Sequence, residues 1–290
     1  MSSARRSLGT VLDIARLTVR ETQRRRILWV AVLMGILFLL IFGLGYHYIL
    51  ADVQAEAPFR RQSAFEFVET IANFLTLTGL YAINFLVIVL AALLSAGSIS
   101  GEVESHTIEA IVTKPLRRWE VVLGKWLGFA VVLTVYLLLL AGGVLLISFW
   151  RSGYRLQNIP VGLGLMLLGA LSMLSLSILG GSRLSTLANG ALAFMLYATA
   201  FIGGWVEQLG AVLRNETAVD LGIVASLIMP ADVLWKRASI LFQPRVLGAM
   251  EFAGPFVVAS QPNDLMIVYA AIYTVGLLLA ALWAFSRRDL

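Results

Sequence analysis

The sequence contains no cysteine and unusually little charge. The lack of cysteine excludes disulfide bonds, thiolate catalysis and cysteine-based metal sites. Charged residues make up 13% of the 290 residues, whereas a soluble globular protein carries about 25%. Hydrophobic residues make up 59%, and the mean hydropathy is +0.87. This composition predicts an integral membrane protein.

Motifs for enzyme chemistry are also missing. No HExxH, GxSxG or paired-aspartate motif occurs, and the two histidines, His47 and His106, are predicted on opposite sides of the bilayer. The nearest approach to a phosphate-binding loop is Gly124-Lys125, but Trp126 follows where Ser or Thr is needed and the upstream glycine is missing. We therefore predict no catalytic, metal-binding or cofactor-binding residue, and no ATP hydrolysis by this chain alone.

Six apolar runs are long enough to cross a hydrocarbon core of about 30 Å as helices. None carries Asp, Glu, Lys or Arg at its centre, which argues against ion coupling through buried carboxylates. The energy for any transport should then come from outside the membrane. The predicted spans are residues 27–51, 79–98, 126–150, 159–179, 187–206 and 265–285.

The segments between the spans complete an all-α prediction. Residues 1–26 place apolar side chains on one helical face and arginines on the others, which is typical of an interfacial elbow helix; the alternative is a basic tail that only sets orientation. Residues 52–69 read as an external loop with a short amphipathic helix. In the external region 207–264, the uncharged stretch Leu221 to Ala231 is too short to cross, so we expect it to dip into the membrane or lie flat.

Most of the 22 lysines and arginines fall in segments that lie inside if both termini are cytoplasmic. This excess follows the positive-inside rule, and the arginines before the first span carry the most weight. The net charge of +5 then reflects topology and anionic membrane lipid, with no nucleic-acid signal. We predict six spans with both termini in the cytoplasm.

The strongly charged segment 99–125, ISGEVESHTIEAIVTKPLRRWEVVLGK, lies between two apolar runs. Ile108, Ile111 and Val112 have the spacing of one helical face, and Pro115 disfavours helical geometry at Lys114 but suits the first turn of a following helix. Acidic residues precede this break and basic residues follow it. The segment could therefore fit a charged groove on a soluble partner, or it could be a solvated loop with ordinary positive-inside charges.

The order of residues in this segment resembles the signature after the second span of ABC-2 type permeases. The matching residues are Glu102, Glu104, Thr107, Ile108, Glu109, Thr113-Lys114-Pro115, Arg118 and Gly124-Lys125. The sequence departs from that pattern at His106, where glycine is common. Within the family, the resemblance is closest to the branch that includes permeases of nitrous-oxide-reductase maturation systems.

The resemblance implies a single ABC-2 transmembrane domain, 1–290, acting as the permease subunit of an ATP-binding cassette exporter in a bacterial or archaeal inner membrane. Its partners would be a second permease copy, most simply an identical one, and two copies of a separate cytoplasmic ATPase that hold ATP and magnesium. Spans one, two and five would line the substrate path, with 207–264 as a lid. The implied ATPase contacts are Glu102, Glu104, Thr107, Glu109, Lys114, Pro115, Arg117 and Arg118.

A non-transporting membrane scaffold, such as the anchor of an assembly or maturation complex, is the alternative function. A co-purifying ATPase distinguishes the two.

Overall fold

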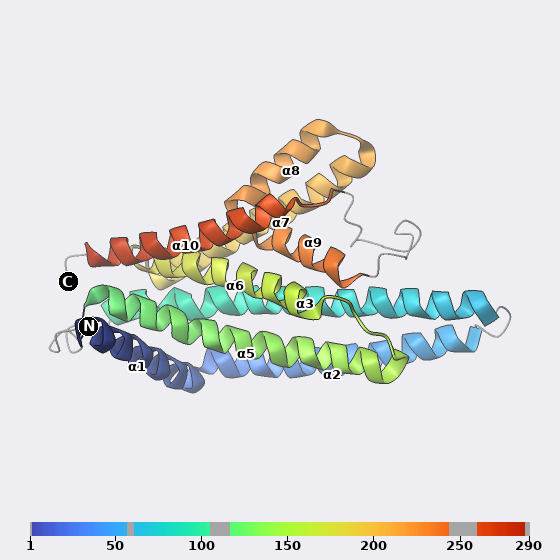
Figure 1. Cartoon of the computed structure of the whole chain (residues 1–290), viewed down its shortest axis with the longest axis horizontal. Helices are drawn as coiled ribbons and strands as arrows, with labels where there is room; N and C mark the ends of the chain where they lie inside the picture. The colour runs from blue at the N-terminus through green and yellow to red at the C-terminus, as the bar shows by residue number, and fades with distance from the viewer. Residues whose placement is uncertain (1, 57–60, 105–116, 244–259, 288–290) are drawn as a thin grey trace.

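The computed structural model describes residues 2–56, 61–104, 117–243 and 260–287, and all of its regular structure in these ranges is helical (Figure 1). Six helices are long and apolar enough to cross a membrane, which confirms the predicted all-α fold with six spans. They are α2 (Arg26–Glu56), α3 (Arg61–Glu104), α5 (Arg118–Ser152), α6 (Ile159–Gly181), α7 (Thr186–Leu213) and α10 (Asp264–Ser286). The other helices are α1 (Ser2–Arg24), α8 (Glu216–Ile228) and α9 (Ala231–Phe242).

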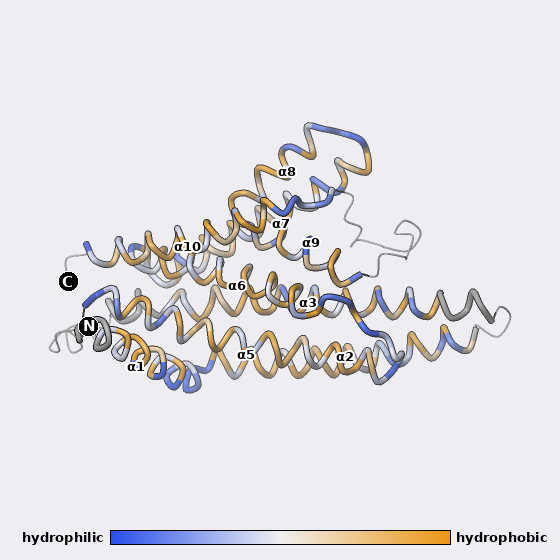
Figure 2. The backbone as a smooth tube through the Cα atoms, in the orientation of Figure 1, coloured by the Kyte–Doolittle hydropathy of each residue, from blue (hydrophilic) through white to orange (hydrophobic). Residues whose placement is uncertain are grey.

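The long helices form a bundle in which both chain termini lie at the same end, on the left in Figure 1. We call this the termini end and the opposite one the far end. The end of α3, the start of α5 and the short α6–α7 connection all lie at the termini end. Figure 2 shows apolar residues along the lengths of α2, α5 and α10, with hydrophilic residues gathered near helix ends.

Helices α3, α5 and α7 extend furthest beyond the predicted spans. Helix α3 runs unbroken from Arg61, so the predicted short external helix within 52–69 is not a separate element; no proline lies between Arg61 and Glu104. Helix α5 begins at Arg118, eight residues before the predicted third span. Helix α7 continues to Leu213 and so carries Glu207 within it.

Helix α1 packs against the first turns of α5 through two glycines. A Cβ added to Gly124 would lie 2.7 Å from Ile14 Cβ, and one added to Gly128 would lie 2.7 Å from Thr18 Cβ and 2.8 Å from the Ala15 carbonyl oxygen. Spaced four apart, these glycines lie on one face of α5 and let the two backbones approach closely. The predicted amphipathic helix therefore has one face committed to α5, with Val11 and Thr18 buried.

Buried hydroxyl groups join α2, α3 and α5 toward the far end. Tyr46 Oη is 3.1 Å from Ser148 Oγ and 2.9 Å from Ser152 Oγ, and Thr76 Oγ1 is 2.7 Å from Ser148 Oγ. Nearby, the Tyr154 hydroxyl donates a hydrogen bond to Asn73 Oδ1 at 3.1 Å. Asn73 of α3 thus helps to hold the connection between α5 and α6.

Helices α8 and α9 form a bent pair at the far end. Gly210 lies beside Ala218 and Gly203 beside Ala225, so α8 runs back into the bundle antiparallel to α7. The chain then turns by 107°, and α9 returns along α6 from Gly169 to Gly162. Pro230 lies at this turn. Such a bent pair is either a broken span or a re-entrant loop, so the re-entrant or interfacial placement of these helices stays a prediction.

The carbonyl groups at the turn between α8 and α9 have no partners within a helix, and side chains of α10 donate hydrogen bonds to them. The Tyr269 hydroxyl donates to the Leu227 carbonyl at 2.6 Å, and the Tyr273 hydroxyl donates to the Ile228 carbonyl at 2.7 Å. Irregular backbone inside a membrane persists only where its polar groups are satisfied. The two tyrosines, one helical turn apart on α10, therefore stabilise the turn.

We predict that Gly128→Ala lowers the apparent free energy of unfolding in detergent by about 1–3 kcal/mol, because the added methyl group overlaps the α1 backbone. Gly142→Ala on the same helix is the control, since no atom lies within 4 Å of a Cβ added there. Denaturant titration of both variants measures the difference. Equal stability of the two variants would contradict this account of the α1–α5 contact.

Candidate functional site between α7 and α9

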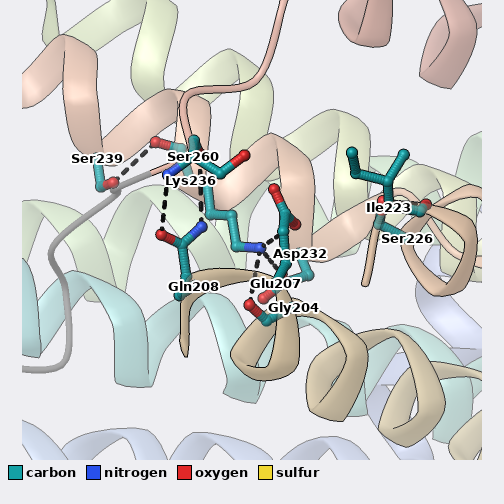
Figure 3. A network of polar contacts seen from close by, with 9 residues as sticks. All are labelled: Gly204, Glu207, Gln208, Ile223, Ser226, Asp232, Lys236, Ser239 and Ser260. Carbon is teal, nitrogen blue, oxygen red and sulfur yellow. Dashed lines mark hydrogen bonds and ion pairs between the residues drawn. The ribbon is translucent and has the colours of Figure 1, made fainter. Parts of the chain in front are cut away.

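Three buried charged side chains meet where α9 crosses α7 (Figure 3). The Lys236 ammonium of α9 lies 2.9 Å from Glu207 Oε2 of α7 and 3.0 Å from Asp232 Oδ2 of α9. It also donates a hydrogen bond to the Gly204 carbonyl of α7 at 3.2 Å. We call Glu207, Asp232 and Lys236 the ion cluster. It links two helices that are separated in sequence by α8.

The ion cluster is shielded from solvent on all sides. The side chains of Lys236, Glu207 and Asp232 are 8%, 6% and 9% exposed. Removing charges from water costs several kcal/mol for each ion, and that cost is offset only by close pairing and hydrogen bonds. The three groups are therefore held together by their own electrostatics as well as by the packing around them.

Sequence spacing places the members of the ion cluster on the faces of α7 and α9 that meet. Asp232 and Lys236 are four residues apart on α9, and Gly204 and Glu207 are three apart on α7, so each pair shares one helical face. Gly204 leaves room for the ion cluster, since an added Cβ would displace the Asp232 carboxylate and lie 3.0 Å from Lys236 Nζ. Asp232 also lies in the first turn of α9, where the helix dipole favours negative charge.

Aromatic side chains from three helices surround the ion cluster. The Tyr81 ring of α3 lies 5.3 Å from the Trp235 ring of α9 and 6.5 Å from the Phe201 ring of α7. Phe201 in turn contacts Tyr197 and Trp205 on α7, at 6.4 and 6.3 Å between ring centroids. Tyr81 and Tyr197 are the two of these residues that interact electrostatically with Asp232, whereas Trp205 is exposed.

Two further contacts tie the chain before α10 to the same region. The Gln208 side chain donates to the Ser260 carbonyl at 3.4 Å and accepts from the Ser260 backbone N–H at 3.3 Å. Arg237 of α9 forms an ion pair with Asp264, the first residue of α10. The ion cluster is therefore the centre of a junction between α7, α9 and the start of α10.

The junction does not resemble a catalytic centre. Within the described ranges, no group of three or more His, Asp or Glu side chains could hold a metal ion. The lysine is engaged by two carboxylates, which suits a structural or gating role better than nucleophilic chemistry. What the arrangement can do is hold α9 against α7 and respond to any change that separates them.

The predicted ATPase contacts lie elsewhere, at the termini end. Glu102 and Glu104 belong to the last turns of α3, Arg117 directly precedes α5, and Arg118 begins it. Glu120 accepts a hydrogen bond from the Arg117 backbone N–H at 3.2 Å, which closes the start of α5. Thr107, Glu109, Lys114 and Pro115 lie outside the described residues, as do the predicted coupling helix and the break near Lys114.

The sequence analysis did not identify the ion cluster. It assigned Glu207, Asp232 and Lys236 to an external region because span five was ended at 206. The available signal was the four-residue spacing of Asp232 and Lys236 directly after a proline, in a segment otherwise rich in apolar residues. Pairing Glu207 with them needed the reversal of direction at the α7–α8 turn, which no local pattern indicates.

Comparison with known proteins identifies the family. The sequence pattern of the ABC-2 family transporter proteins matches residues 12–290, nearly the entire chain. The chain belongs to the ABC-2 transporter family. The uncharacterized protein YhcI of Bacillus subtilis (strain 168) is similar, with 26% identity over 239 residues that cover 79% of this chain and 69% of that protein.

Membership in the ABC-2 family makes this chain a multi-pass membrane permease. Permeases of this family are typically non-catalytic membrane subunits that generally work as dimers together with an ABC ATPase. The resemblance read from the segment between α3 and α5 is therefore confirmed at the level of the family.

We predict that Lys236→Met lowers the apparent free energy of unfolding by about 3–5 kcal/mol, because it leaves the Glu207 carboxylate buried without its partner. Arg16→Met is the control: Arg16 and Asp13 are 3.9 Å apart with side chains 78% and 74% exposed, and removing such a pair changes stability by about 1 kcal/mol or less. Denaturant titration in detergent measures both. If Lys236→Met were as mild as the control, the buried ion pairs would not stabilise the junction.

Proposed function

We propose that this chain is the permease subunit of an ABC exporter and that a separate cytoplasmic ATPase moves it through the segment between α3 and α5. The observation that carries the proposal is the arrangement at the termini end. The ends of α3 and α5 that flank the segment lie there together with α1 (Figure 1). A soluble subunit bound at this end would act directly on two spans.

The packing around this end supports a lever. Helix α1 is held to α5 at Gly124 and Gly128, where the backbones are too close to slide independently. Arg25, at the junction of α1 and α2, reaches the Leu94 carbonyl of α3 at 3.5 Å and pairs with Glu21 at 2.6 Å. A push on the α3–α5 segment would then move α1, α3 and α5 together. The contacting residues are Glu102, Glu104, Thr107, Glu109, Lys114, Pro115, Arg117 and Arg118.

The finer features of the proposal follow the positive-inside rule and the family resemblance. Both termini and the segment 99–125 would face the cytoplasm across a bacterial or archaeal inner membrane. Two permease copies, most simply identical, would bind two ATPase copies that hold ATP and magnesium. Helices α2, α3 and α7 would line the path. The closer likeness to permeases of nitrous-oxide-reductase maturation systems stays a prediction.

The bent pair at the far end would act as a lid over the path. Helix α8 packs chiefly on α7, whereas α9 packs chiefly on α6. A movement of α7 with α8 away from α6 with α9 would open the far end, with the turn around Pro230 as the hinge. The ion cluster joins α7 of the first unit to α9 of the second, so it would hold the lid closed.

We predict that the tagged chain, isolated from its native membrane in mild detergent, brings with it a stoichiometric ATPase subunit. The substitutions Glu102→Ala, Glu109→Ala and Arg118→Ala should each weaken permease-dependent ATPase stimulation without reducing membrane insertion. Asp220→Ala is the control, because Asp220 is exposed on α8 at the far end. A purified chain with no ATPase, under conditions that preserve related complexes, would favour the scaffold function instead.

We further predict that a disulfide across α7 and α9 blocks substrate-linked ATPase stimulation and that reduction restores it. A Cβ added to Gly204 lies 2.9 Å from Asp232 Cγ, so the Cβ atoms of Gly204→Cys and Asp232→Cys lie within about 4.4 Å, in disulfide range. The chain has no native cysteine to interfere.

The matched control for the disulfide between α7 and α9 is a disulfide between α6 and α9, which belong to the same unit. A Cβ added to Gly169 would lie 3.6 Å from Ala231 Cβ, so Gly169→Cys with Ala231→Cys can also form a bridge. This bridge should leave stimulation unchanged in both redox states. Equal activity of the oxidised and reduced α7–α9 pair would contradict the lid.

A further inference from the structure

The ion cluster contains two carboxylates and only one ammonium group. If all three groups are ionised, the cluster carries one uncompensated negative charge in a site whose side chains are less than a tenth exposed. An unpaired ionised group in such surroundings is strongly unfavourable, and a buried group can avoid the penalty by changing its protonation state. The composition of the cluster therefore raises the question of which carboxylate holds a proton.

The geometry distinguishes the two carboxylates. Lys236 donates hydrogen bonds to Glu207 Oε2 and to the Gly204 carbonyl, which occupy two of its three ammonium hydrogens. Asp232 Oδ2 lies 3.0 Å from the same nitrogen, yet it is fully buried and accepts no well-directed hydrogen bond. Glu207 is thus the carboxylate that the ammonium group stabilises in its ionised form, and Asp232 is the one left over.

Among the residues that the structure describes, the groups that face Asp232 supply no second cation. Lys236 of α9 and Glu207 of α7 are the other members of the cluster, and the remaining titratable groups acting on Asp232 are the phenols of Tyr81 on α3 and Tyr197 on α7. Tyrosine is ordinarily neutral below about pH 10. Arg237, next to Lys236 on α9, is paired with Asp264 at the more exposed start of α10.

We propose that Asp232 is a proton-binding site, occupied while α9 is packed against α7, so that the closed junction consists of ionised Glu207, ionised Lys236 and a neutral Asp232 carboxyl group. Separation of α9 from α7 admits water, the O–H bond of the carboxyl group breaks, and the proton passes to that water. Closing the junction takes a proton up again. The position of the lid is thereby linked to pH at the far end, whichever subunit drives the movement.

Isotope-edited infrared spectroscopy of the full-length chain in lipid nanodiscs tests the proposal directly. At pH 7 the wild-type protein should show the carbonyl stretch of a protonated carboxylic acid, shifted by exchange into D₂O. The Asp232→Asn variant should lack this band, whereas the exposed control Asp220→Asn should retain it. A band that survives Asp232→Asn unchanged, or no such band in the wild type, would overturn the assignment.

A second measurement does not depend on how well Asp232→Asn is tolerated in the membrane. Gly204→Ala adds a methyl group against the Asp232 carboxyl group, whereas a Cβ added to Gly190 on the same helix meets only Ala96 Cβ at 3.8 Å. The carboxylic-acid band should shift in Gly204→Ala and stay in place in Gly190→Ala. The same position of the band in both variants would overturn the proposal.

Stability against pH gives an independent readout. A proton bound only in the closed, folded state stabilises that state at low pH, and the stabilisation is lost as rising pH removes the proton. The melting temperature of the wild type should therefore fall between about pH 4, the ordinary pKa of an aspartate, and pH 7 more than that of Asp232→Asn, which mimics the neutral acid at every pH. Identical pH dependence in the two proteins would contradict a bound proton at Asp232.

Discussion

The contact of one lysine with two acidic side chains holds the far half of this permease together. Lys236 cannot reach bulk water, so its position is determined by Glu207 on α7 and Asp232 on α9. Charges are few in this chain, and this buried pairing joins α9 directly to α7. It depends on the room that Gly204 leaves, and it determines how closely α9 approaches α7.

The far half of the bundle consists of two units, α7 with α8 and α6 with α9, and the contact joins them. Close glycine contacts join α8 to α7 at Gly203, Gly210 and Gly222, while α9 lies along α6 with Phe242 against Gly162. The turn between the units is supported by the hydroxyls of Tyr269 and Tyr273 on α10. A hinge that keeps its backbone hydrogen bonds can bend without exposing unsatisfied polar groups to lipid. This combination makes the bent pair suitable as a lid.

The sequence predicted the parts of the fold that depend on local patterns. Uncharged runs of sufficient length gave the six spans, the arginine-rich amphipathic lead gave α1, and the shortness of the run from Leu221 to Ala231 predicted a helix too short to cross, which is α8. Helix ends were predicted less well, because an uncharged run marks where a helix enters lipid and not where the helix ends. Helix α3, for example, continues through Glu66 and Glu69 without a break.

The ion cluster could not be predicted, for a different reason. Its members are 29 residues apart at the widest, and they meet only because the chain reverses after Leu213 and again near Pro230. A charged residue near the end of an apolar run resembles an interfacial residue until its partner is known. The segment between α3 and α5 shows the opposite case, in which a local motif was sufficient to identify the family.

The most direct test of the account is a distance measurement between the two units during the ATPase cycle. Spin labels on Val224 of α8 and Val161 of α6, both exposed, report on the separation of the two units, and labels on Leu209 and Val224 report within the α7–α8 unit. Pulsed electron paramagnetic resonance of the complex with its ATPase should show the first distance change between nucleotide-free and ATP-bound states while the second stays constant. A first distance that is the same in both states would contradict the movement of α7 and α8 as a lid.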